Sequence, residues 1–154
     1  MEHETDVRRE MSAKPRVLIV EDEVVVALFL EDVLDEFGYR VAGVVTQLDD
    51  AMARDVDYDI AVLDVHINGR SVFDFADVLV ARGIPFVFAT GYGERGIPER
   101  HRSSPVLQKP FQPDELKRIL EEISPASKGG QNNKDDRTGN DNRDGKGGHT
   151  IGAA

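Results

Sequence analysis

Five short, continuously apolar segments alternate with amphipathic segments along the middle of this chain. The apolar segments are residues 17–20, 41–45, 60–63, 86–89 and 106–107. Strands with apolar side chains at consecutive positions are typical of a sheet that is covered on both faces. Because helical patterns separate these segments, the sequence predicts an α/β domain with a doubly wound, five-stranded parallel sheet and helices on both faces.

The amphipathic segments carry the periodicity of helices. The first ends at Gly38, and its apolar face consists of Val26, Leu30, Val33, Leu34 and Phe37. Residues 46–49 and 71–74 each fit a capping box, which predicts a helix start at both places. Pro113 fits the first position of a last helix. Residues 91–98 hold several glycines and a proline and are poor helix material, so the fourth helix is expected to be short, irregular or mobile.

Composition divides the 154 residues into one folding unit and two flanking segments. Residues 125–149 are almost entirely small, polar or charged, and seven of the 14 glycines follow Ser124. Such a segment cannot bury enough apolar surface to offset its loss of conformational entropy. We therefore expect a disordered N-terminus at 1–14, a domain at 15–124 and a disordered tail at 125–154, with no output domain after the folding unit.

Charge and composition exclude several classes of function. The formal net charge is −10 and the chain forms no basic stripe, which argues against nucleic-acid binding. There is no cysteine, so disulfides and thiolate chemistry are excluded. No apolar run approaches a membrane span, and no signal peptide is recognisable. The sequence predicts a cytoplasmic protein without a membrane or nucleic-acid partner.

Polar residues follow four of the predicted strands. They are residues 21–23 after the first, Asp64 after the third, Thr90 after the fourth and Lys109 after the fifth. In open parallel sheets, ligands bind outside the carboxyl ends of the strands, so these side chains are expected to converge there. Two carboxylates 4 Å apart repel by roughly 4 kcal/mol at an effective dielectric constant of about 20. A divalent cation relieves this repulsion, and oxygen ligands with retained waters favour Mg²⁺.

This set of residues suits phosphoryl chemistry. With Mg²⁺ bound, the Asp64 carboxylate is expected to attack an electrophilic phosphorus and form an aspartyl phosphate. Lys109 is then expected to bind one phosphoryl oxygen as a point charge, and Thr90 to donate a hydrogen bond to another.

Four motifs in order carry a resemblance to a known family. They are Val20-Glu21-Asp22-Glu23, Leu63-Asp64, Phe88-Ala89-Thr90-Gly91 and Lys109-Pro110. Together they resemble the receiver domain of bacterial two-component response regulators, over residues 16–123. The resemblance implies a flavodoxin-like fold with strand order 2-1-3-4-5.

The resemblance also implies the roles of individual residues. Glu21 and Asp22 would hold Mg²⁺ and its waters, with Asp64 as phosphoacceptor and further ligand. The backbone carbonyl of His66 would be another metal ligand, while its side chain is expected to be exposed in a loop. Lys109 and Thr90 would sense the phosphoryl group, and the peptide bond between Lys109 and Pro110 would be cis.

Residues 85–93, Pro-Phe-Val-Phe-Ala-Thr-Gly-Tyr-Gly, look like the signature of the FAT GUY group of single-domain response regulators. This likeness implies a histidine kinase of the HWE or HisKA2 type as partner. Val106 departs from the receiver pattern, in which an aromatic residue three positions before the lysine turns inward on phosphorylation. The Gly-rich segment after Thr90 is therefore expected to be the part that moves.

The sequence predicts a phosphorylation-controlled signalling module, not an enzyme. A downstream protein is expected to bind the face formed by the segment after Thr90, the fifth strand and the last helix, with Leu116 among the residues that test it. One alternative is a phosphate sink or shuttle for a kinase. Another is a constitutive pseudo-receiver that binds a partner without phosphorylation. A Mg²⁺-dependent phosphohydrolase with an aspartyl nucleophile is disfavoured because His66 occupies the place of the second aspartate that such enzymes need.

The glycines at 91, 93 and 96 match the spacing of a dinucleotide-binding fingerprint. That fingerprint belongs after the first strand and before a regular helix. Here it follows the fourth predicted strand and precedes Pro98, so a nucleotide site is not expected.

Overall fold

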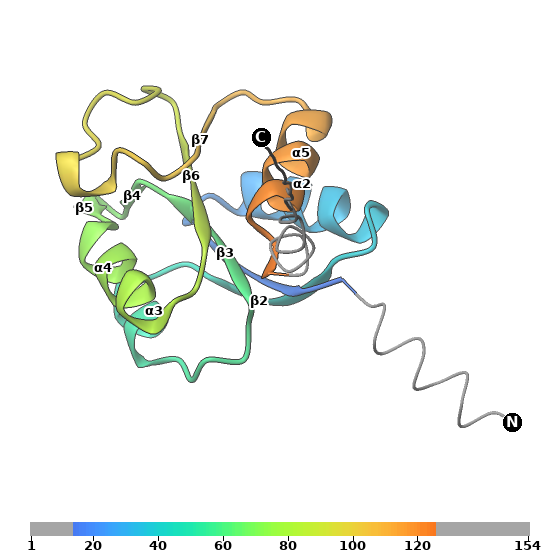
Figure 1. Ribbon diagram of the computed structural model, residues 1–154, viewed down its shortest axis with the longest axis horizontal. Coiled ribbons are helices and arrows are strands. Elements are labelled where there is room, and N and C mark those ends of the chain that lie inside the picture. The colour runs from blue at the N-terminus through green and yellow to red at the C-terminus, as the bar shows by residue number, and fades with distance from the viewer. Residues whose placement is uncertain (1–13, 126–154) are drawn as a thin grey trace, which may run out of the picture.

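A computed structural model describes residues 14–125, which contain a five-stranded parallel sheet (Figure 1). The strands are β1 (Arg16–Val20), β2 (Arg40–Val45), β3 (Ile60–Asp64), β6 (Phe86–Thr90) and β7 (Val106–Gln108). Their order in the sheet is β2-β1-β3-β6-β7, which is the predicted order 2-1-3-4-5 when the strands of this sheet are counted along the chain. The prediction of a doubly wound parallel sheet is confirmed.

Within the described residues, four α-helices cover the sheet. They are α2 (Val24–Glu36), α3 (Leu48–Ala53), α4 (Phe73–Arg82) and α5 (Pro113–Ile123). Figure 1 shows α3 and α4 on one side of the sheet and α2 and α5 on the other. Each side has its own apolar core. Along β1, Leu18 and Val20 belong to the core under α3 and α4, whereas Val17 and Ile19 belong to the other. This alternation explains why the strands are apolar at consecutive positions.

Both predicted capping boxes are wrong. The helix α3 begins after Gln47 and α4 begins after Val72, and neither has a side-chain capping hydrogen bond. Ser71 instead belongs to a short strand, where it pairs with His66. Because strand pairing fixes this backbone, the Ser71 hydroxyl does not stand at the start of α4. The helix α5 begins at Pro113 as predicted.

A small hairpin that the sequence analysis missed follows β3. Its strands are β4 (His66–Ile67) and β5 (Arg70–Ser71). The turn between them is Asn68-Gly69, with φ angles of +52° and +81°. Asn-Gly favours this left-handed pair of conformations and is a strong signal of a tight hairpin. The hairpin lies directly beyond the carboxyl end of β3.

The connection between β6 and β7 consists of turns and the three-residue 3₁₀-helix η1 (Glu99–His101). The prediction of a short or irregular fourth helix is confirmed, since residues 91–96 form turns and the three residues of η1 are the helical part of this connection. The predicted disorder at 1–14 and 125–154 lies, apart from Lys14 and Pro125, outside the described residues. Within residues 14–125, none of the helices has the length and apolar character needed to cross a membrane.

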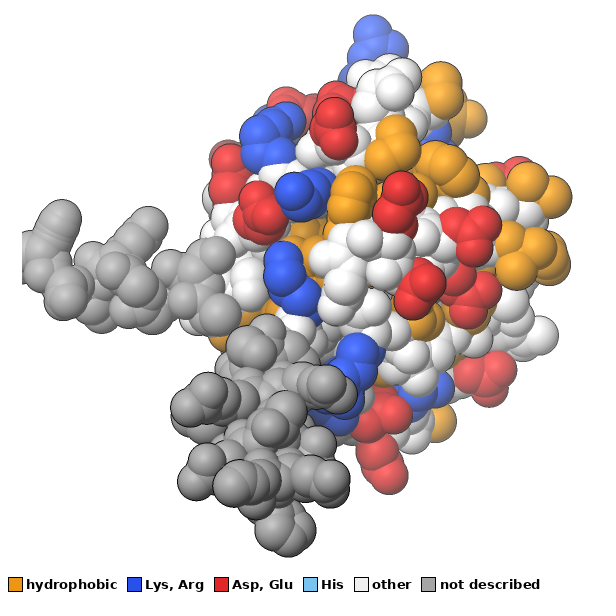
Figure 2. Space-filling view, turned by 90° about the vertical axis from the view of Figure 1, so that its right-hand side faces the viewer, with side chains coloured by type: hydrophobic (Ala, Val, Ile, Leu, Met, Phe, Trp, Pro, Cys, Tyr) orange, Lys and Arg blue, Asp and Glu red, His pale blue; other side chains and the backbone are white. Residues whose placement is uncertain are grey.

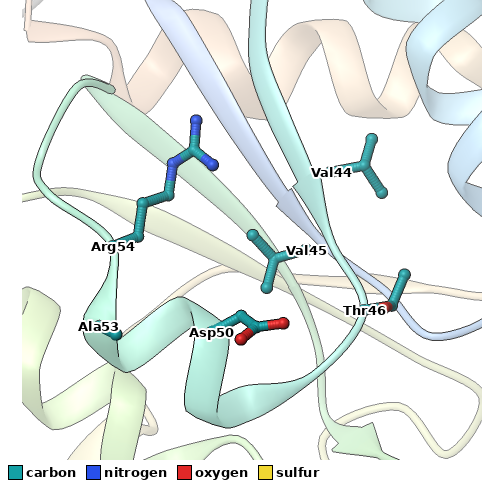
Figure 3. A pocket seen from close by; sticks show the side chains of 6 residues that line it. All are labelled: Val44, Val45, Thr46, Asp50, Ala53 and Arg54. Atoms are coloured by element: carbon teal, nitrogen blue, oxygen red, sulfur yellow. The ribbon is translucent and has the colours of Figure 1, made fainter.

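The edge strand β2 carries an irregularity at Ala42, because Val17 pairs with Val41 whereas Leu18 pairs with Gly43. The carbonyl oxygen of Ala42 accepts a hydrogen bond of 2.9 Å from Nη2 of Arg54. A Cβ atom at Gly43 would lie 2.8 Å from the same nitrogen, so the missing side chain leaves room for the guanidinium. Figure 3 shows Arg54 beside β2, at the depression between this strand and α3.

Candidate functional site

The predicted site residues lie at the carboxyl ends of adjacent strands. Glu21 follows β1, Asp64 ends β3, Thr90 ends β6 and Lys109 follows β7. Because β1, β3, β6 and β7 are neighbours in the sheet, side chains far apart in the sequence meet at one edge. The structure therefore brings together the carboxylates and the lysine that the sequence analysis selected.

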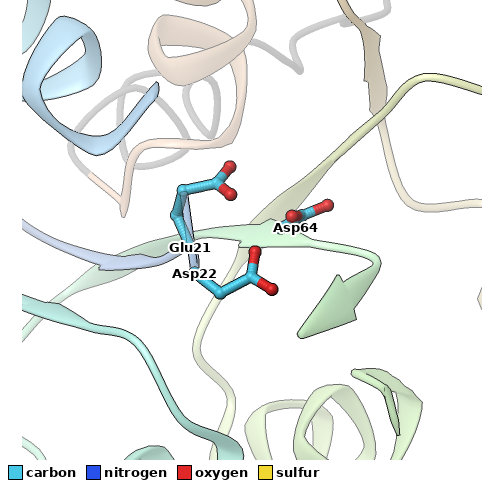
Figure 4. A group of neighbouring side chains, drawn as sticks. All are labelled: Glu21, Asp22 and Asp64. Carbon is cyan, nitrogen blue, oxygen red and sulfur yellow. The ribbon is translucent and has the colours of Figure 1, made fainter. Parts of the chain in front are cut away.

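Three carboxylates form the centre of this edge. Glu21, Asp22 and Asp64 each offer an oxygen atom, and these atoms lie within 4.8 Å of one another (Figure 4). The side chain of Glu21 is buried, with 2% exposed, and that of Asp64 is 14% exposed. The backbone N–H of Glu23 donates to Oε1 of Glu21 at 3.1 Å. The backbone N–H of Asn68 donates to Oδ2 of Asp22 at 2.7 Å.

The contact from Asn68 was not foreseen. It depends on the hairpin turn, which carries this N–H group from beyond β3 back to Asp22. The Asn-Gly dipeptide was the sequence signal that would have revealed it.

Lys109 supplies the one ammonium group at these carboxylates among the described residues. Its Nζ lies 2.9 Å from Oε2 of Glu21 and 3.5 Å from Oδ2 of Asp64. Its backbone N–H donates to the carbonyl oxygen of Thr90 at 2.8 Å, which ties the end of β7 to the end of β6. The peptide bond between Lys109 and Pro110 is cis, as the resemblance implies.

Burial dominates the electrostatics of this cluster. It raises the pKa of Glu21 to about 7; the hydrogen bond and charge of Asp64 add to this effect, whereas the hydrogen bond from Lys109 opposes it. Burial by itself would lower the pKa of Lys109, but the neighbouring Glu21 and Asp64 carboxylates raise it overall. One ammonium thus faces three carboxylates, and the surplus of negative charge favours a further cation.

An open depression of about 690 Å³ gives access to this edge between Asp64, Thr90 and Lys109. Thr90 is buried, and its Oγ1 accepts a hydrogen bond of 3.1 Å from the backbone N–H of Tyr92. The side chain of His66 is exposed, and its ring meets that of Tyr92 edge-on, with centroids 6.5 Å apart. The imidazole is therefore not part of the acidic cluster.

Two further predicted positions have different environments. Val106 is partly buried, pairs with Phe88 and packs against the core under α3 and α4. Leu116 is fully buried, so the prediction that it contributes to an exposed partner-binding face is wrong. It belongs to the apolar stripe of α5 that faces the sheet.

Exposed apolar side chains gather instead at the start of α2. Val24, Val25, Leu28 and Phe29 are between 42% and 78% exposed. On the face of the molecule that carries α2 and α5, Figure 2 shows hydrophobic side chains exposed among acidic ones. Val24 directly follows Glu23, which lines the depression at the carboxylates.

Comparison with known proteins adds independent findings. No family model matches the chain. The solved structure of SdrG from Sphingomonas melonis Fr1 is 42% identical, covers 73% of this chain and 98% of its own, and has a TM-score of 0.66. Another structure is described as the BeF3-activated conformation of SdrG, with 43% identity over 71% of this chain and 95% of that one and a TM-score of 0.61.

A third solved structure is the signal receiver domain of a modulated diguanylate cyclase from Desulfovibrio desulfuricans G20. It is 29% identical, covers 77% of this chain and 99% of its own, and has a TM-score of 0.64. The transcriptional regulatory protein PdtaR of Mycobacterium tuberculosis is 32% identical over 107 residues, which are 66% of this chain and 52% of PdtaR. This chain thus spans about half the length of the curated relatives that it matches.

A parallel sheet with polar side chains gathered at its carboxyl edge is the architecture of a doubly wound α/β domain whose ligand site lies at that edge. The SdrG structures match nearly their full length at more than 40% identity. This chain belongs to the receiver-domain family of response regulators.

Proposed function

We propose that this protein is a phosphorylation-controlled response regulator in which Asp64 accepts a phosphoryl group from a histidine kinase. The observation that carries the proposal is the position of Asp64. Its carboxylate lies with those of Glu21 and Asp22, 3.5 Å from Nζ of Lys109, at an open depression. A nucleophile, a cation and solvent access thus occur at the same point.

The donor set fits a magnesium ion. Glu21, Asp22, Asp64 and the backbone carbonyl of His66 would hold it, since Mg²⁺ prefers oxygen ligands and retains several waters. Burial and the negative charge of Asp64 raise the pKa of Glu21 to about 7, which indicates that the cluster has too little positive charge to balance its carboxylates. When bound, Mg²⁺ supplies that charge and offsets the negative charge of the transferred group.

The transfer itself forms one bond and breaks one. An oxygen of the Asp64 carboxylate attacks the phosphorus of a phosphohistidine, and the bond between phosphorus and nitrogen breaks. The electron pair of that bond returns to the imidazole, which then takes up a proton. The product on this chain is an acyl phosphate at Asp64.

Lys109 and Thr90 act on the product. The ammonium of Lys109 is within reach of both Glu21 and Asp64. When Asp64 is phosphorylated, this ammonium exchanges its contact with the carboxylates for one with a phosphoryl oxygen. The Thr90 oxygen already accepts a hydrogen bond from Tyr92, which leaves its own proton free to donate to the phosphoryl group.

The kinase contact is assigned to the start of α2. A donor histidine must approach Asp64 across the rim of the depression, and the exposed Val24, Val25 and Leu28 begin next to that rim. An apolar face of this kind suits a histidine-bearing helix of the kinase. The likeness of residues 85–93 to the FAT GUY signature supports a kinase of the HWE or HisKA2 type.

A downstream protein is assigned to the segment after Thr90, β7 and the outer face of α5. Tyr92, which is 70% exposed, is the large apolar side chain available there. Phosphorylation would change binding at this face by shifting the population of two conformations. The protein is proposed to act in the cytoplasm without enzymatic turnover of a substrate.

The phosphate-sink and hydrolase alternatives predict a different fate of the phosphoryl group. The hydrolase alternative needs a second aspartate at the place of His66. The exposed His66 ring instead packs on Tyr92 and lies outside the acidic cluster. A constitutive binding module predicts neither metal affinity nor an adduct.

The deciding experiment is intact-mass analysis after incubation with acetyl phosphate, with and without Mg²⁺. We expect one added phosphoryl group that requires both Mg²⁺ and Asp64, and its loss in Asp64→Asn. Asp49→Asn, at a carboxylate that is 82% exposed, is the matched control and should behave as the wild type.

No adduct together with no Mg²⁺ affinity would refute the proposal in favour of a binding module. An adduct that appears and is rapidly released as phosphate would favour the sink or the hydrolase. Transfer from a purified HWE-type or HisKA2-type kinase then tests the choice of partner.

A further inference from the structure

His101 is a buried imidazole outside the acidic site. The buried polar or charged residues of the described chain are Glu21, Thr90, His101 and Ser124. His101 lies on η1, in the connection between β6 and β7, and is 3% exposed. A buried polar ring is costly unless it is hydrogen-bonded. Its Nε2 lies 2.8 Å from Oδ1 of Asp77 on α4, which provides that bond.

Three phenylalanine rings surround this imidazole. Phe73, the first residue of α4, is stacked on it with centroids 6.1 Å apart and planes 23° apart. Phe86 and Phe88, both on β6, meet it edge-on at 6.0 Å and 5.8 Å. The phenylalanines also touch one another, since the Phe88 ring lies 5.7 Å from Phe73 and 5.2 Å from Phe86. The imidazole thus packs against both the sheet and α4.

This cluster lies on the same face of β6 as Thr90. Side chains two residues apart on a strand share a face, so Phe86, Phe88 and Thr90 form one row. The β7 neighbour of Phe88 is the short, aliphatic Val106. The aromatic ring that Phe88 meets in the connection between β6 and β7 is that of His101.

Asp77 holds two consecutive residues of η1. Nε and Nη2 of Arg100 donate to its two carboxylate oxygens at 2.9 Å and 3.1 Å, beside the bond from His101. The connection is thus tied to the end of β6 by the hydrogen bond from the Tyr92 N–H to Thr90 Oγ1, and to α4 by the bonds to Asp77. A movement of η1 away from α4 would break the bonds to Asp77.

We propose that His101 is a positioning residue that couples Thr90 to α4 when Asp64 is phosphorylated. Displacement of Thr90 and Phe88 shifts the imidazole in its aromatic box, and the bond to Asp77 passes the shift to α4. The surface formed by η1 and α4 then reports the phosphorylation state. This inference rests on the proposed function and names the route by which that site is regulated.

The test compares backbone amide NMR shifts of the full chain with Mg²⁺, before and after addition of beryllofluoride, an acyl-phosphate mimic. In the wild type we expect changes at Asp64 and Thr90 that extend to His101 and α4. His101→Phe keeps a ring in the box without the hydrogen bond, and Asp77→Asn weakens the same link from the other side. Both should retain the changes at Asp64 and Thr90 and lose those in α4.

Asp49→Asn is the matched control, because it removes an exposed carboxylate paired with Arg70 and should keep the wild-type pattern. Wild-type changes in α4 that persist in His101→Phe and Asp77→Asn would overturn the inference and leave the proposed function standing. NMR changes in the wild type that stop at Thr90 would also overturn the inference and leave the proposed function standing. No change at Asp64 in the wild type would refute the proposed function and the inference with it. If His101→Phe fails to fold, Asp77→Asn decides, since that side chain is 44% exposed.

Discussion

Replacing Glu21 with glutamine should remove a pH-dependent loss of stability from the metal-free protein. The Glu21 side chain is only 2% exposed, and burial raises its pKa from 4.5 to about 7. The folded state therefore binds this proton more tightly than the unfolded state does. Stability contributed by the protonated carboxyl is present below about pH 4.5 and is lost as the pH rises through about 7.

The size of this loss follows from the two pKa values. A pKa difference of one corresponds to about 1.4 kcal/mol, so the change from 4.5 to about 7 amounts to about 3 kcal/mol. Glutamine retains the shape of the side chain and does not titrate. Between about pH 4.5 and about pH 7.5, the free energy of unfolding should fall by about 3 kcal/mol more in the wild type than in Glu21→Gln.

Urea unfolding followed by circular dichroism, in EDTA and at a series of pH values, measures this difference. Glu23→Gln is the control, because Glu23 is an exposed neighbour whose own side chain lies outside the three-carboxylate cluster. Addition of Mg²⁺ at pH 7.5 should stabilise the wild type more than Glu21→Gln, which lacks one proposed ligand. Parallel pH profiles for the wild type and Glu21→Gln would refute the argument that burial and like charge dominate this site.

Further substitutions test other parts of the structure. Val25→Glu, on the exposed start of α2, should slow phosphoryl transfer from the kinase by at least tenfold, about 1.4 kcal/mol; an unchanged rate would contradict the kinase contact, and labelling by acetyl phosphate should stay normal. Leu116→Ala should lower the free energy of unfolding by about 3 kcal/mol in urea titrations, because Leu116 is fully buried. Gly83→Ala should cost about 1 kcal/mol in the same assay, since Gly83 ends α4 with φ of +73°. The hydrogen bond from Arg100 lowers the pKa of Asp77, so the ionised carboxylate stabilises the folded state. Asp77→Asn should therefore lower the free energy of unfolding, by less than about 1 kcal/mol at this half-exposed position. This difference from the wild type should vanish as the pH falls below 4.

The strands and the carboxyl-edge residues were accessible from the sequence because both depend on local pattern. Runs such as 17–20 and 60–63 are apolar at every position, and this marks burial on both faces. Once the sheet is parallel, the residues at the carboxyl ends of the strands must lie at one edge, so the sequence alone places Asp64 and Thr90 near each other.

Features that depend on contacts between distant segments were not accessible. Leu116 is a different case, because the helical spacing of Leu116, Ile119 and Leu120 already indicates burial. Its packing against the sheet excludes the expected role at a partner-binding face. Ser71 matched a capping pattern, but pairing with His66 determines its backbone. The burial of His101 arises from residues of α4 and β6 that meet only in the folded chain.

The irregularity in β2 bears on how this protein behaves at high concentration. An edge strand exposes backbone groups that can pair with a strand of another molecule. Here the carbonyl of Ala42 is already bonded to Arg54, and Gly43 lets the guanidinium lie close against the strand. An incoming strand would have to displace an ion-paired arginine, because Nη2 of Arg54 also lies 3.0 Å from Asp57. The same side chain that completes the hydrogen bonding of β2 thus protects this edge of the sheet against intermolecular strand addition.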